Sequence, residues 1–128
     1  MKPELTLLAW SVILAIVHMV IAVQGLVGKQ GLMAAIGNRE GLPEVTGWGG
    51  RAIRASRNMA ENLPLFAAVV LAAVVIGKTN AMTLLGAQLF FYGRIAYAVC
   101  YIGGITWART ASWLVSIAGI VLILLQLN

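Results

Sequence analysis

The amino-acid sequence predicts an all-α membrane protein, a four-transmembrane-helix antiparallel bundle. Three observations support that fold class: the composition, four long apolar runs, and short connections between the later runs. Hydrophobic residues make up 61% of the 128-residue chain and charged residues only 10%, and the mean hydropathy is +0.93. A soluble domain of this size could not bury so much apolar surface. The runs also lack the alternating pattern of membrane-spanning strands, which favours helices.

The four runs place the expected spans at about residues 5–23, 54–76, 82–106 and 111–127. Each reaches or approaches the roughly 20 residues that a helix needs to cross the hydrocarbon core. The first run is too long for the apolar core of a signal peptide, and no small-residue cleavage site follows it, so we expect a retained span. The short later connections predict antiparallel neighbours. Residues 1–128 are thus expected to form a single four-helix membrane domain with a polar loop at 24–50.

The distribution of basic residues predicts the orientation of these spans. The chain carries a net charge of +5, and in a membrane protein such an excess sets topology more readily than it binds nucleic acid, so no nucleic-acid partner is expected. Lys2 and Lys78 lie on one side. The positive-inside rule therefore puts both termini outside and the loop 24–50 in the cytoplasm. The basic residues expected on the cytoplasmic side are Lys29, Arg39, Arg51, Arg54, Arg57 and Arg109.

Polar residues gather on one face at the start of the second span. At 100° per residue they fall within a sector of about 140°, which makes one polar stripe along about three helical turns. Arg51, closest to the membrane surface, is expected to extend toward water and not to contact a ligand. The members of the stripe are Arg51, Arg54, Arg57, Asn58, Glu61 and Asn62.

The third span carries a matching polar face within the segment "FFYGRIAYAVCYIGG". Arg94, Tyr97 and Tyr101 are spaced i, i+3, i+7, so they share one side of a helix. Arg94 lies well inside the apolar run. It therefore has no short route to the membrane surface, and an interior partner is expected for it.

The charges on these two faces do not balance. Arg54, Arg57 and Arg94 are opposed by a single carboxylate, Glu61. An ionised group near mid-membrane costs about 2.5–3.5 kcal/mol unless it is paired or hydrated, and arginine keeps its proton. Guanidinium groups favour carboxylates and phosphates, so the surplus predicts a site for a small polar anion. The alternative is an interhelical salt-bridge network completed by water.

The string "RASRNMAENLPLF", followed by "RIAYAVCYIGG" and then Arg109, resembles the MAPEG family, the membrane-associated proteins in eicosanoid and glutathione metabolism. The similarity covers nearly the whole chain and points to a bacterial member like the microsomal glutathione transferases. It implies a homotrimer in a bacterial inner membrane, with glutathione held between subunits near the cytoplasmic face. The residues that the resemblance assigns to glutathione binding are Arg54, Arg57, Asn58, Glu61, Asn62, Arg94, Tyr97 and Tyr101.

The resemblance also implies the chemistry. Arg109 stands where family enzymes present an arginine to the glutathione sulfur, so Arg109 is expected to stabilise the thiolate while Tyr101 or Thr110 donates a second hydrogen bond. The thiolate would attack a membrane-soluble electrophile or a lipid hydroperoxide, which makes the chain a transferase or peroxidase. The alternative is a non-catalytic scaffold that binds lipid or glutathione. Some relatives have histidine at the position of Tyr97, and a basic residue expected near Leu26 is absent, where Lys29 or Arg39 could substitute.

Three further signals are weaker. His18 lies alone within the first span, where it either contacts a ligand or bonds to a neighbouring helix. Cys100 flanks the polar face of the third span and reads as a small packing residue. No Cys/His cluster has the spacing of a metal site, so no metal is expected and glutathione is the only expected co-substrate.

Overall fold

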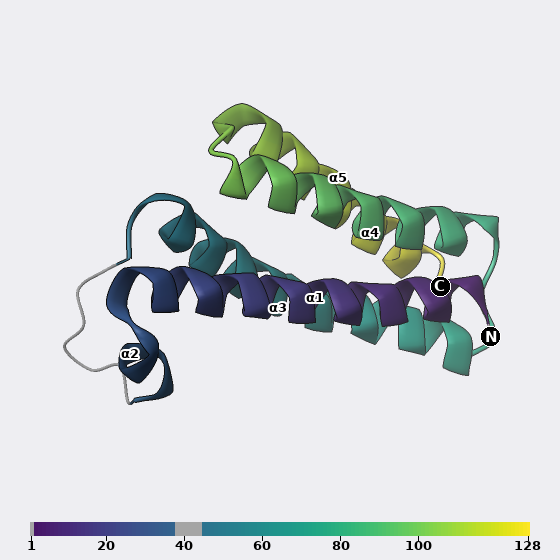
Figure 1. Ribbon diagram of the computed structural model, residues 1–128. Helices are drawn as coiled ribbons and strands as arrows, with labels where there is room; N and C mark the ends of the chain where they lie inside the picture. The colour runs from purple at the N-terminus through teal and green to yellow at the C-terminus, as the bar shows by residue number, and fades with distance from the viewer. Residues whose placement is uncertain (1, 38–44) are drawn as a thin grey trace.

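The computed structural model describes residues 2–37 and 45–128, without the side chains of residues 29, 34 and 35. Within these residues every regular element is a helix, and Figure 1 shows their arrangement. Four helices are long and one is short. They are α1 (Pro3–Gln30), α2 (Leu32–Ile36), α3 (Gly47–Val75), α4 (Ala81–Ile102) and α5 (Thr106–Leu125).

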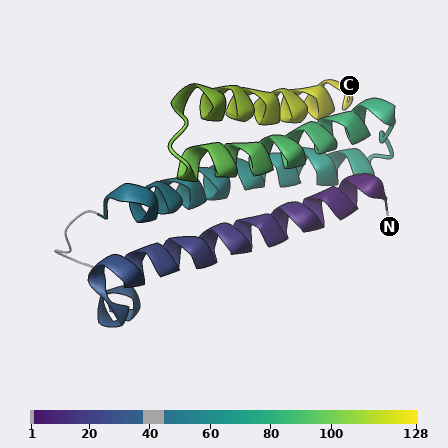
Figure 2. The same cartoon turned by 45° about the horizontal axis from the view of Figure 1, so that its top comes forward.

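The four long helices are each long and apolar enough to cross a membrane. Their order along the chain matches the four apolar runs, which confirms the predicted all-α four-helix bundle. Both chain ends lie at the same end of the bundle, and α2 lies at the opposite end (Figures 1 and 2). Successive long helices therefore run antiparallel.

The helix boundaries differ from the expected spans at the end of the bundle that holds the loop. The first helix continues to Gln30, past the expected limit at 23, and α3 begins at Gly47, so the expected loop 24–50 is largely helical at both ends. Helix α4 stops at Ile102, before the expected limit at 106, because Gly104 adopts a positive φ of 82° that ends the helix. Helix α5 then begins at Thr106, before the expected start at 111.

The long helices pack as two pairs, α1 with α3 and α4 with α5. Glycine permits very close contact in both pairs. A Cβ atom on Gly25 would lie 2.7 Å from the Cα atom of Gly49 in the first pair, and one on Gly86 would lie 2.6 Å from the carbonyl oxygen of Gly119 in the second. Figure 2 shows α4 and α5 side by side along their length. Small residues at helix contacts are typical of membrane bundles, where close backbone packing takes over from the hydrophobic effect.

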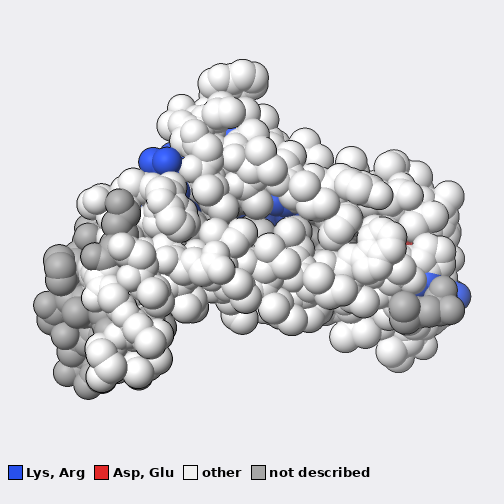
Figure 3. All heavy atoms as spheres, in the orientation of Figure 1, with Lys and Arg blue, Asp and Glu red and all other residues white. Residues whose placement is uncertain are grey.

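The outer surface is apolar over most of its area. Figure 3 shows a face on which charge lies near the two ends and in one recess between them. Exposed large side chains on this surface include Ile13, Ile16 and Leu124, each more than half exposed. Such a surface suits lipid contact, since lipid chains are as apolar as the side chains themselves.

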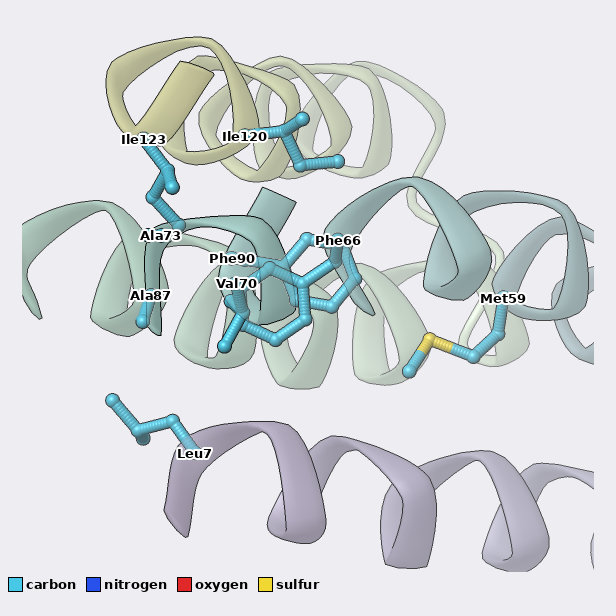
Figure 4. Packing of buried hydrophobic residues seen from close by; sticks show 9 residues of the cluster. All are labelled: Leu7, Met59, Phe66, Val70, Ala73, Ala87, Phe90, Ile120 and Ile123. Carbon is cyan, nitrogen blue, oxygen red and sulfur yellow. The ribbon is translucent and has the colours of Figure 1, made fainter. Parts of the chain in front are cut away.

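The two helix pairs meet around a core of large side chains in the half of the bundle that holds the termini (Figure 4). Phe66 of α3 and Phe90 of α4 are both fully buried and stack with ring centroids 4.0 Å apart. Ile120 and Ile123 of α5 and Leu7 of α1 complete the contact. This core fixes the two pairs against each other one helical turn before Arg94, where the polar part of the bundle begins.

Candidate functional site

A pocket of about 270 Å³ lies between three helices at the end of the bundle opposite the termini. Helix α3 contributes one lining residue, and the others come from the end of α4 and the beginning of α5. Because α4 and α5 are joined by a tight turn, their polar residues face each other across that turn. The pocket is lined by Asn58, Tyr97, Tyr101, Arg109, Thr110 and Trp113.

Two arginines and two tyrosines form a ladder along this pocket. The guanidinium carbon of Arg94 lies 4.2 Å from the ring centroid of Tyr97, and that of Arg109 lies 4.6 Å from the ring centroid of Tyr101. The two tyrosine rings are 5.3 Å apart. A cation over an aromatic face is attracted to its π electrons, and the attraction grows when both are removed from water. The ladder therefore holds two positive charges in fixed positions without a carboxylate.

Asn58 is positioned in the pocket by Asn62, one turn further along α3. The Asn62 amide nitrogen lies 2.7 Å from the backbone oxygen of Asn58 and 3.0 Å from its side-chain oxygen. Asn62 is buried and Asn58 is half-buried. With its oxygen held in this way, the Asn58 amide keeps its own N–H groups available to a ligand in the pocket.

Two arginines on consecutive turns of α3 contact the end of α4. The Arg54 Nε donates to the hydroxyl oxygen of Tyr101 at 3.1 Å. One turn earlier, the Arg51 Nε donates to the backbone oxygen of Ile102 at 2.9 Å. Arg51 was expected to extend toward water, and the structure instead places it half-buried against the last residue of α4. Sequence spacing alone could not reveal this contact, because it joins residues 51 positions apart.

Arg94 is the largest fully buried side chain in the described part of the chain. None of its three guanidinium nitrogens has a hydrogen-bond partner, and no ion pair compensates its charge. His18 of α1 is also buried, with Nδ1 2.8 Å from the oxygen of Leu14 and with Nε2 unpartnered. The Arg94 charge therefore lies between the two helix pairs without a compensating charge from the described residues. Burying an unpaired charge in this way lowers the stability of the fold.

Arg57 and Glu61 are not among the residues that line the pocket. Both are exposed on the single chain, and Arg57 borders a separate groove of about 410 Å³ between α1 and α3. Adjacent positions on a helix point about 100° apart, so Arg57 and Asn58 face different grooves although they are neighbours in sequence. Within the described residues Glu61 forms no ion pair with an arginine. The groove is lined by Met19, Ala22, Val23, Leu26, Ile53, Ser56, Arg57 and Ala60.

The structure thus brings together part of the predicted set. Asn58, Tyr97, Tyr101 and Arg109 share the pocket, with Arg54 and Asn62 in direct contact with its lining, while Arg94 lies under Tyr97. Thr110 also lines the pocket, and its hydroxyl donates to the backbone oxygen of Thr106 at 3.3 Å. Trp113 lines the pocket as well, although the sequence motifs did not include it. Arg39 and the side chain of Lys29 lie outside the described residues. The described residues hold no group of three or more potential metal ligands, and Cys100 is a half-buried free thiol.

Four apolar helices long enough to cross a membrane, with a cationic pocket at one end, define an α-helical integral membrane protein. The sequence model of the MAPEG family matches residues 7–127, so the chain belongs to the MAPEG family, whose members act in eicosanoid and glutathione metabolism. None of the curated proteins compared with the chain matches it. The family match confirms the resemblance seen in the two polar motifs.

Proposed function

We propose that this protein binds glutathione in the cationic pocket and activates its thiol for attack on membrane-soluble electrophiles or lipid hydroperoxides. One observation carries the proposal: the pocket holds Arg109 and lies above Arg94, and no carboxylate of the described chain neutralises either charge. The predicted alternative, an interhelical salt-bridge network, requires ion pairs that the described residues do not form.

The charge of glutathione complements this arrangement. The tripeptide carries two carboxylates, one ammonium group and a thiol. Arg54 and Arg94 supply guanidinium groups of the kind that bind carboxylates, and Asn58 supplies neutral hydrogen bonds. Glu61, exposed and free of an ion pair, is the group that would receive the ammonium. The family match supports glutathione over other small anions.

We further propose that the complete site forms between subunits of a homotrimer. The pocket of one chain, about 270 Å³, is smaller than the roughly 300–1,000 Å³ typical of small-molecule sites. Arg54, Arg57 and Glu61 are exposed on the single chain, although polar groups at this depth normally face a partner or a water-filled cavity. A second copy that covers them would join their charges to the pocket.

The proposed chemistry depends on Arg109. A free cysteine-type thiol with a pKa near 8.5 is only a few per cent ionised at pH 7, and lowering that pKa by two units requires about 2.7 kcal/mol. A guanidinium group in a partly dry site supplies stabilisation of that order. Tyr101, with its ring under Arg109 and its hydroxyl bonded to Arg54, is the second group at the sulfur.

Either of two reactions can follow from the thiolate. With a halogenated aromatic, the sulfur forms a carbon–sulfur bond and halide leaves. With a hydroperoxide, the sulfur takes the outer oxygen, the alcohol is released, and a second glutathione thiol then forms the disulfide and water. In this proposal both substrates reach the pocket from the bilayer. The positive-inside rule places the pocket end of the bundle on the cytoplasmic side of a bacterial inner membrane, with both termini outside.

Ultraviolet absorbance of the purified protein in detergent tests the proposal. Adding glutathione at pH 7 should produce thiolate absorbance, and a model electrophile should be turned over. Arg109→Ala should retain most glutathione affinity while kcat falls about 100-fold, because two pKa units of thiolate stabilisation are lost. Lys78→Ala, at the opposite end of the bundle, is the matched control and should behave as wild type. Glutathione binding without thiolate or turnover would identify a non-catalytic scaffold.

A further inference from the structure

The backbone hydrogen bonds that close the turn between α4 and α5 leave one of the last four carbonyls of α4 without an amide donor. The amides of Gly103, Gly104 and Ile105 donate to the oxygens of Val99, Tyr101 and Cys100 at 3.0, 3.0 and 2.8 Å. With Gly104 at φ +82°, the last two bonds form the pair that commonly ends a helix at a left-handed glycine. The oxygen of Ile102 receives no backbone amide from the described residues.

Arg51 satisfies that remaining oxygen. Its Nε lies 2.9 Å from the Ile102 oxygen, and its guanidinium group packs against the turn, because a Cβ atom built on Gly104 would lie 3.8 Å from the Arg51 Nε and Cζ. A cation at this position is favoured twice, by the hydrogen bond and by the negative end of the helix dipole. Arg51 thus joins the first helix pair to the end of the second.

We propose that Arg51 is a positioning residue that fixes the α4–α5 turn and thereby holds Arg109 over Tyr101. The proposal rests on the proposed function, in which Arg109 stabilises the glutathione thiolate. Arg109 lies in the first turn of α5, and its backbone amide donates to the oxygen of Ile105 at 3.3 Å. The position of Arg109 therefore follows the position of the turn.

Two contacts act on the same segment from α3. Arg54 holds the side chain of Tyr101, and Arg51 holds the backbone of the next residue. Arg54 alone would leave the backbone of the turn free to shift while the Tyr101 ring stays in place. Such a shift changes the 4.6 Å separation between the Arg109 guanidinium and that ring, which is the geometry that a thiolate in the pocket would meet.

Substitutions at position 51 separate a hydrogen bond from a charge. Arg51→Met keeps an unbranched side chain but has no donor. Arg51→Gln is neutral and places an N–H donor at the same distance along the side chain as the arginine Nε, so it can restore the bond to Ile102 without the charge. Lys78→Met is the matched control, because Lys78 also bonds to a carbonyl near a helix end, that of Leu127 at 3.3 Å, far from the pocket.

Hydrogen exchange of the trimer-forming protein in detergent, without glutathione, gives a readout that does not depend on activity. Protection of the Gly104 and Ile105 amides should fall about tenfold or more in Arg51→Met, because a hydrogen bond from a charged group is lost. Arg51→Gln should retain most of the protection. The control should match wild type.

Kinetics then link the turn to the chemistry. In Arg51→Met the pH profile of thiolate absorbance should move upward and kcat should fall about tenfold, while KM for glutathione changes less than threefold. Arg51→Gln should recover most of kcat. If both variants lose activity equally, or if KM alone rises, Arg51 acts through its charge on the ligand and the positioning role is wrong. Unchanged exchange in Arg51→Met would also overturn it, even if wild type formed no thiolate and the proposed function had failed.

Discussion

The two ends of the bundle differ in whether their polar groups find partners within the chain. At the end that holds the termini, the buried Glu4 carboxylate accepts a hydrogen bond from Thr83 at 2.6 Å. The side chain of Asn80 caps α4 and also bonds to Gln126 at 2.9 Å. At the opposite end, the buried Arg94 guanidinium lies over the Tyr97 ring but has no hydrogen-bond partner, and Glu61 has no ion pair within the described residues.

That contrast distinguishes polar groups that stabilise the fold from polar groups that remain available to a ligand. A buried polar group with its partners in the same chain stabilises the fold, whereas one left without a partner lowers stability unless something else binds it. The terminal end has therefore completed its interactions on folding, and the site end has not. Three substitutions sharpen this difference, in order of expected effect.

Arg94→Met should have the largest effect, and it should change stability and binding in opposite directions. Removing an unpaired buried charge should raise the free energy of unfolding in detergent by an amount on the order of 2.5–3.5 kcal/mol. Glutathione affinity should fall at least tenfold, since a guanidinium that pairs with a carboxylate is lost. Thermal unfolding and titration calorimetry measure the two quantities. A destabilised variant with wild-type affinity would mean that Arg94 is a structural residue.

Thr83→Val tests the opposite end and should destabilise without affecting the site. The substitution leaves the Glu4 carboxylate buried without its donor, at a cost of about 1.5–3 kcal/mol in the free energy of unfolding. Glutathione affinity of the folded protein should stay within twofold of wild type. The matched control is Thr79→Val, which removes only the exposed bond from Lys2. A fall in affinity comparable to that of Arg94→Met would erase the distinction between the two ends.

Asn62→Leu should have the smallest effect, because it acts on the pocket through Asn58. It removes the two donations that hold the Asn58 oxygen atoms, worth about 1 kcal/mol, so glutathione should bind about fivefold more weakly. Asn58→Leu, which removes the pocket group itself, should weaken binding further. Equal affinity in wild type and Asn62→Leu would show that Asn58 holds its position without help.

The sequence predicted the helices well and their ends less well, for a physical reason. Apolar runs of sufficient length predict helices that can cross a membrane, and all four runs form such helices. Where a helix ends depends on local backbone geometry. Gly103 and Gly104 are individually compatible with a continuing helix, and the hydrogen bonds that close the turn at Gly104 follow from its positive φ, which hydropathy does not register.

For the site, helical spacing predicted what lies on one helix and could not predict what lies between helices. The i, i+3, i+7 spacing of Arg94, Tyr97 and Tyr101 placed them on one face, and the ladder along the pocket follows that face. The stripe on α3 spans a sector wide enough to border two grooves, so Arg57 and Asn58 separate. The role of Arg51 depended on which carbonyl α4 leaves unsatisfied, and that is known only from the folded chain.

The close glycine contacts between α4 and α5 have a mechanical consequence. Gly86 lies against Gly119, and Gly93 lies against the backbone of Ser116, so the two helices touch through their main chains with no layer of side chains between them. Side chains can change rotamer and let helices slide, but main chains in contact cannot yield in this way. Between Gly86 and Gly93, α4 and α5 therefore move as one rigid unit, so the pocket can widen only at its boundary with α3 or at the turn beyond Gly93.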